Sequence, residues 1–270
     1  MKKGRARFFF FFLFLTLLFT GLPLQAHAAW FSDVPANAWY SQAVSSLADR
    51  GIIAGTGGTT FSPNATLTRG AFVTMLAKSA LSASDLQQYN FKGSFKDVST
   101  SHWSNRYVNW AVETNVVDGY ENGTFQPDKA VTRQEMAVMV RNFAQSTGKQ
   151  FPSINSPVTF QDQGKIASWA LSAVKLCQQA DVINGDADTK RFRPTDRASR
   201  AEAASICYKF LENCQNDGYT IVQKRVNNTP VRAVVFSPYD YTAGLVLGQD
   251  MVDGAESVTC LISRTGAVIA

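Results

Sequence analysis

A segment of about 65 residues occurs three times in this chain of 270 residues. The motif FSDV at 31–34 recurs as FKDV at 95–98 and, more loosely, as FQD at 160–162, so that successive copies start 64 and 65 residues apart. A Trp, a Phe-x-Pro motif and an Arg follow in the same order in each copy. Repetition at a fixed period is typical of small units that bury their apolar faces against one another. We therefore expect one compact assembly of three units.

Each unit has the pattern of helix, loop and helix. In the second copy an apolar stripe has the spacing i, i+4, i+7, i+8 of one helix face. The stripe consists of Trp103, Tyr107, Trp110 and Ala111. We expect these residues in the core, with the helix ending at Asn115, as the equivalent helix of the first copy ends at Gly51. The expected units are residues 29–83, 95–145 and 159–214, called copies 1, 2 and 3 below.

The second helix of a unit begins with a capping box, Ser/Thr-x-x-Glu, in two of the copies. The pairs are Thr132 with Glu135 and Ser199 with Glu202. In this motif the hydroxyl accepts from the backbone N–H three residues on, while the Glu side chain accepts from the N–H of the cap. Copy 1 keeps the cap at Thr68 but has Ala71 in place of the Glu.

An arginine follows directly after each cap, as Arg69, Arg133 and Arg200. A cation in the first turn is unfavourable, because the helix dipole is positive there. Three such arginines indicate a bound anion, since free helix N–H groups and a guanidinium fork converge well on a carboxylate. The alternative is a salt bridge within the protein, for example to the Asp of each opening motif. We favour the ligand.

Together and in this order, these motifs resemble the S-layer homology repeat over residues 31–210. The resemblance implies a mainly α fold with pseudo-threefold symmetry, in which three prongs surround a central helical bundle. Grooves between the prongs would bind a secondary cell wall polymer on peptidoglycan, often through the carboxylate of a pyruvate ketal. By position, the implied glycan-binding residues are Arg69, Arg133, Arg200, Asp33, Asp97, Asp162, Trp39, Trp103, Trp169, Gly55, Gly119 and Gly185.

The three copies match this pattern unequally. Copy 2 has the full pattern, so we expect Arg133 to matter most. Copy 3 has Gln163 where an apolar residue is usual, Ser199 instead of Thr, and one extra residue in its loop. Its groove is therefore expected to contribute least.

The N-terminus predicts export. Basic residues precede an apolar run over 8–19, and Ala26 with Ala28 forms a small-x-small cleavage site, which is typical of a signal peptide over residues 1–28. A retained membrane anchor would need about 20 apolar residues. Cleavage removes four basic residues and lowers the formal net charge from +5 to +1. With no dense basic cluster after the leader, we expect no nucleic-acid partner. After cleavage of the leader we expect no membrane partner.

The four cysteines form no CxxC pair, so no metal site is expected. A disulfide between Cys177 and Cys207, on neighbouring helices of copy 3, stays open. Cys207 and Cys214 would be about 10 Å apart along one continuous helix, too far for a disulfide.

Residues 216–270 change to short β-like runs at 219–222, 231–236 and 243–247. The stretch from 231 to 270 resembles the opening strands of the phosphodiester glycosidase domain. An alternative function is therefore the front portion of a wall-anchored glycosidase, inactive as given. A self-assembling lattice subunit ranks third, because about sixty residues are too few for an assembly domain.

The leading expectation is a binding module without catalytic residues or cofactors. After the leader the chain has a single histidine, His102, and no pair of acids that could act as acid and base. We expect a secreted monomer at the cell wall that anchors an exported protein without covalent bonds.

Overall fold

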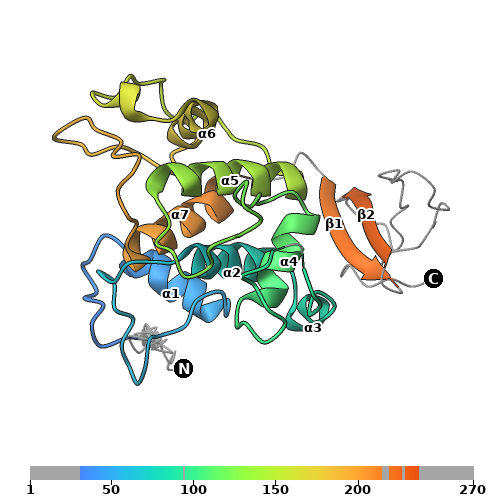
Figure 1. Cartoon of the computed structure of the whole chain (residues 1–270). Helices are drawn as coiled ribbons and strands as arrows, with labels where there is room; N and C mark the ends of the chain where they lie inside the picture. Colours follow the sequence, from blue (N-terminus) through green and yellow to red (C-terminus); the bar gives the residue numbers. More distant parts are fainter. Residues whose placement is uncertain (1–30, 94, 215–218, 227–228, 237–270) are drawn as a thin grey trace, which may run out of the picture.

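The computed structural model describes residues 31–93, 95–214, 219–226 and 229–236 (Figure 1). The predictions for the signal peptide and for residues 237–270 lie outside this part. The α-helices are α1 (Ser41–Asp49), α2 (Arg69–Ala80), α3 (Ala83–Gln87), α4 (Asn105–Glu113), α5 (Arg133–Thr147), α6 (Ser168–Gln179) and α7 (Arg200–Asn213). A 3-10 helix, η1 (Gln163–Lys165), and the strands β1 (Tyr219–Val226) and β2 (Thr229–Phe236) complete the described elements.

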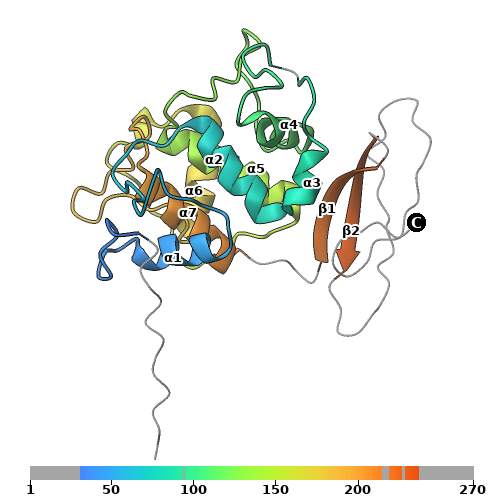
Figure 2. The same ribbon diagram turned by 90° about the horizontal axis from the view of Figure 1, so that it is seen from below.

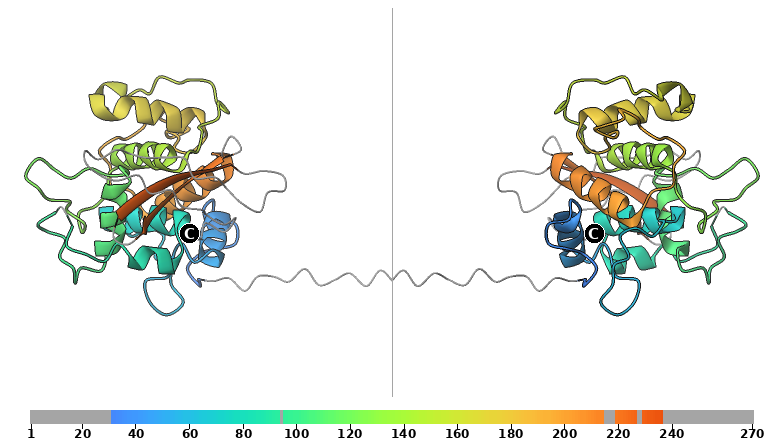
Figure 3. Two further views of the ribbon diagram at one scale, coloured as in Figure 1. Left: turned by 90° about the vertical axis from the view of Figure 1, so that its right-hand side faces the viewer. Right: turned by 90° about the vertical axis from the view of Figure 1, so that its left-hand side faces the viewer.

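The second helices of the three copies, α2, α5 and α7, form the centre of the molecule (Figures 1 and 2). Each of them is covered by the first helix of the next copy, since α4 packs on α2, α6 on α5 and α1 on α7. In both views of Figure 3, α6 (yellow) lies directly above α5 (yellow-green). The last of these contacts joins copy 1 to copy 3, so the arrangement closes on itself.

A ring of backbone hydrogen bonds links the segments that precede the central helices. The N–H of Leu67 donates to the carbonyl of Ala198 (2.9 Å), Ala198 donates to Val131 (3.0 Å), and Val131 donates back to Leu67 (3.0 Å). Each copy thus makes the same bond to its neighbour. This cyclic pattern agrees with the pseudo-threefold arrangement expected from the sequence.

The core forms where the three copies meet. The ring of Trp110 contacts that of Phe143, and Phe143 contacts Phe210, with centroids 6.0 and 5.3 Å apart. The prediction of a core position was right for Trp110, which is 2% exposed, and wrong for Trp103, which is 52% exposed. Trp103 lies in the turn before α4, which begins at Asn105, and so it lies off the helical stripe.

The first helices of copies 1 and 2 end as predicted, and that of copy 3 ends in the same way. Gly51 and Asn115 follow α1 and α4 with φ of 69° and 57°, and Asp181 follows α6 with φ of 56°. A left-handed residue closes the last turn and allows the chain to reverse into the loop. The loops between the two helices of each copy start from these points.

Beside the helical bundle, β1 and β2 form an antiparallel hairpin whose register pairs Tyr219 with Phe236 (Figures 1 and 2). The expected runs at 219–222 and 231–236 fall within it. The expected run at 243–247 lies outside the described residues. No helix of the described part is long and apolar enough to cross a membrane.

The three cysteines of the described part, Cys177, Cys207 and Cys214, are buried as free thiols. Cys177 lies against the carbonyl of Ala137, with 3.7 Å from Sγ to oxygen, and the Sγ of Cys207 lies 3.6 Å from the hydroxyl of Ser79. The disulfide between Cys177 and Cys207 that the sequence left open does not form in this structure. Burial raises the pKa of Cys207 to about 11 and that of Cys214 to about 12.

Candidate functional site

The aspartate of each opening motif fixes the Phe-x-Pro turn of its own copy. The carboxylate of Asp33 accepts from the backbone N–H groups of Phe61 and Ser62, both at 2.7 Å. These bonds, first that of Phe61, hold the pKa of Asp33 below its ordinary value. The equivalent sets are Asp97 with Phe125 and Gln126, and Asp162 with Phe192 and Arg193. The middle residue of each turn has positive φ, so the carboxylate stabilises a strained turn.

The loop glycines allow a close approach of the opening phenylalanine ring. A Cβ on Gly119 would lie 2.0 Å from Cε1 of Phe95. A Cβ on Gly55 or Gly185 would likewise lie within 3 Å of the ring of its own copy's opening phenylalanine. These glycines do not have positive φ, so space rather than backbone conformation requires them here.

Each arginine reaches into the loop of the following copy. The Nε of Arg200 donates to the carbonyl of Phe61 at 2.8 Å, and its guanidinium carbon lies 4.5 Å from the centroid of the Phe61 ring. The other pairs are Arg69 with Phe125 and Arg133 with Phe192. The aspartate therefore positions the carbonyl to which the arginine binds. We name the sites around Phe61, Phe125 and Phe192 grooves 1, 2 and 3.

In grooves 2 and 3 the arginine is paired with the capping-box glutamate of the neighbouring copy. Nη1 of Arg69 lies 2.9 Å from Oε1 of Glu135, and Nη1 of Arg133 lies 3.1 Å from Oε1 of Glu202. Both arginines are buried, with 4% and 5% exposure. The alternative of an internal salt bridge is thus right for these two arginines, but the acid is the glutamate and not the opening aspartate.

Glu135 is held as a carboxylate. Burial acts to raise its pKa, but the hydrogen bonds from Thr132 and the charge of Arg69 outweigh burial and hold the pKa below its ordinary value. The hydroxyl of Tyr120 also donates to it, at 3.0 Å. The predicted capping boxes of α5 and α7 are confirmed, and Thr68 caps α2 without a glutamate.

The helix N–H groups that we expected to face an anion are occupied. The N–H of Arg69 donates to the carbonyl of Lys129, and that of Gly70 donates to Pro127. The equivalent groups of α5 and α7 donate to the neighbouring copy in the same way. This part of the sequence-based argument is therefore wrong, because assembly of the three copies satisfies these donors with carbonyl groups.

Groove 1 differs from the other two, because Ala71 stands where they have a glutamate. Nη2 of Arg200 donates to the carbonyl of Ala54 at 2.7 Å, whereas Nη1 has no partner among the described residues. Burial lowers the pKa of Arg200, and the charge of Asp33 acts to raise it. Arg200 is partly exposed. Of the three arginines, Arg200 is the one whose Nη1 is not paired with a glutamate.

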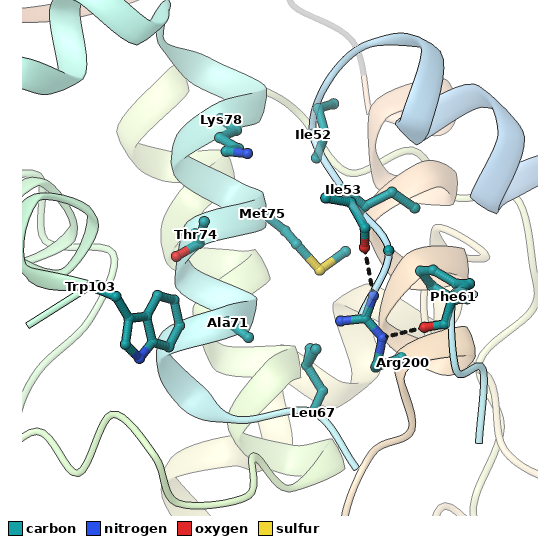
Figure 4. A pocket seen from close by; sticks show the side chains of 12 residues that line it. Ile52, Ile53, Phe61, Leu67, Ala71, Thr74, Met75, Lys78, Trp103 and Arg200 are labelled. Carbon is teal, nitrogen blue, oxygen red and sulfur yellow. Dashed lines mark hydrogen bonds between the residues drawn. The ribbon is translucent and has the colours of Figure 1, made fainter. Parts of the chain in front are cut away.

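A cavity of about 390 Å³ opens at this point. Trp103 and Arg200 lie on opposite sides of α2, and Ala71, Met75 and Lys78 lie between them (Figure 4). The lining contains two cations, Lys78 and Arg200, and no acid. Groove 1 therefore offers positive charge beside apolar side chains and an exposed indole. All three copies contribute to it.

Sequence reasoning missed Ala71 and Lys78 as groove residues. Ala71 was visible as a gap in the capping box, but its place beside Arg200 in the lining of one cavity depends on how copy 3 packs against copy 1. The other two tryptophans of the set, Trp39 and Trp169, are also exposed, at 68% and 53%. The three tryptophans at equivalent positions are thus exposed, whereas the aspartates and arginines of the same set are buried or partly buried.

His102 has neighbours that resemble a catalytic triad. Its Nδ1 lies 2.9 Å from the hydroxyl of Ser104, and its Nε2 lies 3.4 Å from a carboxylate oxygen of Asp128. Ser104 is 0% exposed, and its backbone N–H donates to Nδ1. A buried hydroxyl cannot attack a bound substrate, so this group serves the turn before α4. Within the described part no cluster of three or more potential metal ligands occurs.

Residues 31–73, 94–137 and 159–204 match the model of the S-layer homology domain. Among curated proteins, the chain is 29% identical over 207 residues to the amylopullulanase of Thermoanaerobacterium thermosulfurigenes, which covers 74% of this chain and 11% of that protein. It is 29% identical over 153 residues to the cellulosome-anchoring protein of Acetivibrio thermocellus, covering 56% and 33%. It is 35% identical over 129 residues to the surface-layer 125 kDa protein of Lysinibacillus sphaericus, covering 46% and 11%.

The chain thus spans between 11% and 33% of the length of these relatives. The matched segments begin at or next to the opening phenylalanine of each copy and end beyond the capping motif. They contain the aspartate, the Phe-x-Pro turn and the arginine that build the grooves. The chain therefore carries three S-layer homology repeats.

Proposed function

We propose that this chain anchors an exported protein to the bacterial cell envelope by binding an anionic secondary cell wall polysaccharide without covalent bonds. The observation that carries the proposal is groove 1, where two cations and an exposed tryptophan line a cavity with no acid. The names of two relatives, a cellulosome-anchoring protein and a surface-layer protein, support a place at the cell surface.

The groove suits a sugar that carries a carboxylate. A guanidinium binds a carboxylate through charge-assisted hydrogen bonds, and an indole face packs against the apolar face of a sugar ring. Met75 and Ile53 would contact a small apolar substituent. A pyruvate ketal combines a carboxylate with a methyl group, and we propose it as the recognised substituent.

The structure leads us to rank the arginines differently from the sequence. Arg133, expected to matter most, is buried and paired with Glu202, whereas Arg200 keeps a free donor beside the cavity. We propose that Arg200 binds the polymer and that Arg69 and Arg133 hold the copies together. The aspartates and loop glycines would position the turns rather than touch the glycan.

The protein that this anchor would carry is a separate proposal. Other relatives are named as enzymes, such as the amylopullulanase and an exoglucanase of Acetivibrio thermocellus. The resemblance of residues 231–270 to a phosphodiester glycosidase domain favours such a cargo. We expect no hydrolase activity from the chain as given.

The test is co-sedimentation of residues 29–270 with purified sacculi, before and after chemical removal of the secondary polymer. We expect the protein to pellet with intact walls and to stay in solution with stripped walls. Arg200→Ala should weaken pelleting at least tenfold, because a hydrogen bond to a charged group contributes more than about 1.4 kcal/mol. Arg197→Ala, three residues away and exposed, is the matched control and should pellet like the wild type.

Two results would contradict the proposal in different ways. Equal pelleting on intact and stripped walls would exclude the polymer as the partner. Polymer-dependent pelleting that Arg200→Ala leaves unchanged would keep the anchor and exclude groove 1 as its site.

A further inference from the structure

Grooves 2 and 3 each hold a carboxylate in the same pose. Oε1 of Glu135 accepts from Nη1 of Arg69 at 2.9 Å, and its Oε2 accepts from the backbone N–H of Thr132 at 2.8 Å. In groove 3 the corresponding distances from Glu202 are 3.1 Å to Nη1 of Arg133 and 2.8 Å to the N–H of Ser199. Two independent copies therefore show where a carboxylate fits between the arginine and the helix cap.

Groove 1 has the same two donors but lacks the carboxylate. Nη1 of Arg200 and the backbone N–H of Thr68 occupy the equivalent positions, and neither has a partner among the described residues. Ala71 is shorter than glutamate by one methylene and the carboxylate itself. The cavity lies against Ala71 and Arg200, so the space is open to a ligand. Figure 4 shows the unbonded terminal nitrogen of Arg200 pointing toward α2.

We propose that, of the three grooves, groove 1 alone takes an external carboxylate, which occupies the position filled by Glu135 and Glu202 in the other two. This inference rests on the proposed function and specifies its site and number: one carboxylate-bearing sugar per chain. The ligand completes the capping box that copy 1 lacks. It gains one oxygen contact to Arg200 and one to the N–H of Thr68.

Grooves 2 and 3 exclude the same ligand, because their own glutamates already occupy the position of its carboxylate. The glutamate is tethered one helical turn from its cap residue, so it acts at a high effective concentration that a free carboxylate cannot match. Displacing it would also leave a partly buried glutamate without its hydrogen bonds, which is unfavourable. The arginines of these grooves are accordingly hardly exposed.

A single substitution should close groove 1. Ala71→Glu restores the capping box and supplies Arg200 with an internal partner, so the variant should fold at least as well as the wild type. Ala80→Glu, on an exposed position of the same helix outside the cavity, adds the same charge and is the matched control. A third variant, Glu202→Ala, should open groove 3 by leaving Nη1 of Arg133 free.

The probe is a methyl hexoside with a 4,6-pyruvate ketal, titrated calorimetrically into residues 29–270, with the hexoside lacking the ketal as a blank. We expect one bound ketal per chain for the wild type and for Ala80→Glu. Ala71→Glu should lower the affinity at least tenfold and raise the midpoint of thermal unfolding. Glu202→Ala should raise the number of bound ketals from one to two.

The inference is overturned if the wild type binds two or three ketals, or if Ala71→Glu binds the ketal as tightly as Ala80→Glu does. It is also overturned if the number stays at one in Glu202→Ala while that variant remains folded by circular dichroism. Polymer-dependent sedimentation of the wild type separates these outcomes from failure of the proposed anchoring function, because sedimentation does not depend on the number of open grooves.

Discussion

Gly119 and Asp97 show how residues that recur in every copy can act through packing rather than through a ligand. The aspartate binds two backbone N–H groups of its turn at 2.9 and 2.7 Å, and the glycine leaves room for the Phe95 ring. Both fix the carbonyl of Phe125, to which Arg69 donates. They affect the groove through the arginine and are best described as positioning residues.

Replacing Gly119 with alanine should therefore destabilise the fold. The added Cβ would lie 2.0 Å from Cε1 of Phe95, so the ring must move out of a packed site. Overpacking of this kind lowers the free energy of unfolding by about 1–3 kcal/mol. Urea unfolding followed by circular dichroism measures the change.

Gly164→Ala is the matched control for that substitution. Gly164 has open space around its Cα and lies exposed in η1. Its replacement should change the free energy of unfolding by no more than about 0.5 kcal/mol. Equal free energies of unfolding for the two variants would show that the close approach of the Phe95 ring does not require glycine at position 119.

Among the secondary-structure elements, the starts of α2, α5 and α7 combine helix capping with contacts between copies. Every start has a hydroxyl cap, an arginine that points into the next copy, and two N–H groups bound to that copy. The glutamate of the capping box completes two of the three. One element thus sets both the helix end and the interface between copies.

Loss of Glu135 should cost far more than loss of an ordinary cap. Glu135→Ala removes the cap contact and leaves the buried guanidinium of Arg69 without its acid. Removing one partner of a buried ion pair costs about 3–5 kcal/mol. We expect a loss of this size in urea unfolding, whereas Glu121→Ala, at an exposed loop position, should stay within about 0.5 kcal/mol of the wild type. A loss near the 1 kcal/mol typical of a cap would argue against the ion pair.

Helix starts and stops could be predicted from the sequence better than the contacts that these helices make with other copies. Capping boxes and helix stops depend on residues a few positions apart, so Thr132 with Glu135 and the stop at Gly51 could be read directly. The pairing of Arg69 with Glu135 joins residues 66 positions apart in different copies. No local pattern indicates such a pair. Trp103 was misplaced because the helical spacing continued past the true start of α4.

For the whole molecule, the decisive property is that the three copies close a ring. Arg69 of copy 1 reaches into copy 2, Arg133 of copy 2 reaches into copy 3, and Arg200 of copy 3 reaches back into copy 1. The three contacts between copies are nearly equal, so a single open binding site arises when only one of them lacks its glutamate. The replacement of one glutamate by Ala71 provides this difference, so stability and binding are divided among equivalent positions.

Stability of this ring should fall in acid. The pKa values of Asp33, Asp162 and Glu135 lie below their ordinary values of 3.8, 3.8 and 4.5. A carboxyl group whose pKa is lower in the folded than in the unfolded state stabilises the fold above its ordinary pKa. That contribution disappears as the pH falls through the folded-state pKa, because the unfolded chain takes up the proton first.

The urea midpoint should therefore stay nearly constant from pH 7 to about pH 5 and fall steadily below that. Asp33→Asn removes one of the three carboxylates, so this variant should be less stable than the wild type at pH 7 and should lose less on acidification. The two unfolding curves would approach each other near pH 3. A midpoint that stays level or rises below pH 4 would show that the turns are held without these carboxylates, and the ring would then depend on its backbone hydrogen bonds and core packing alone.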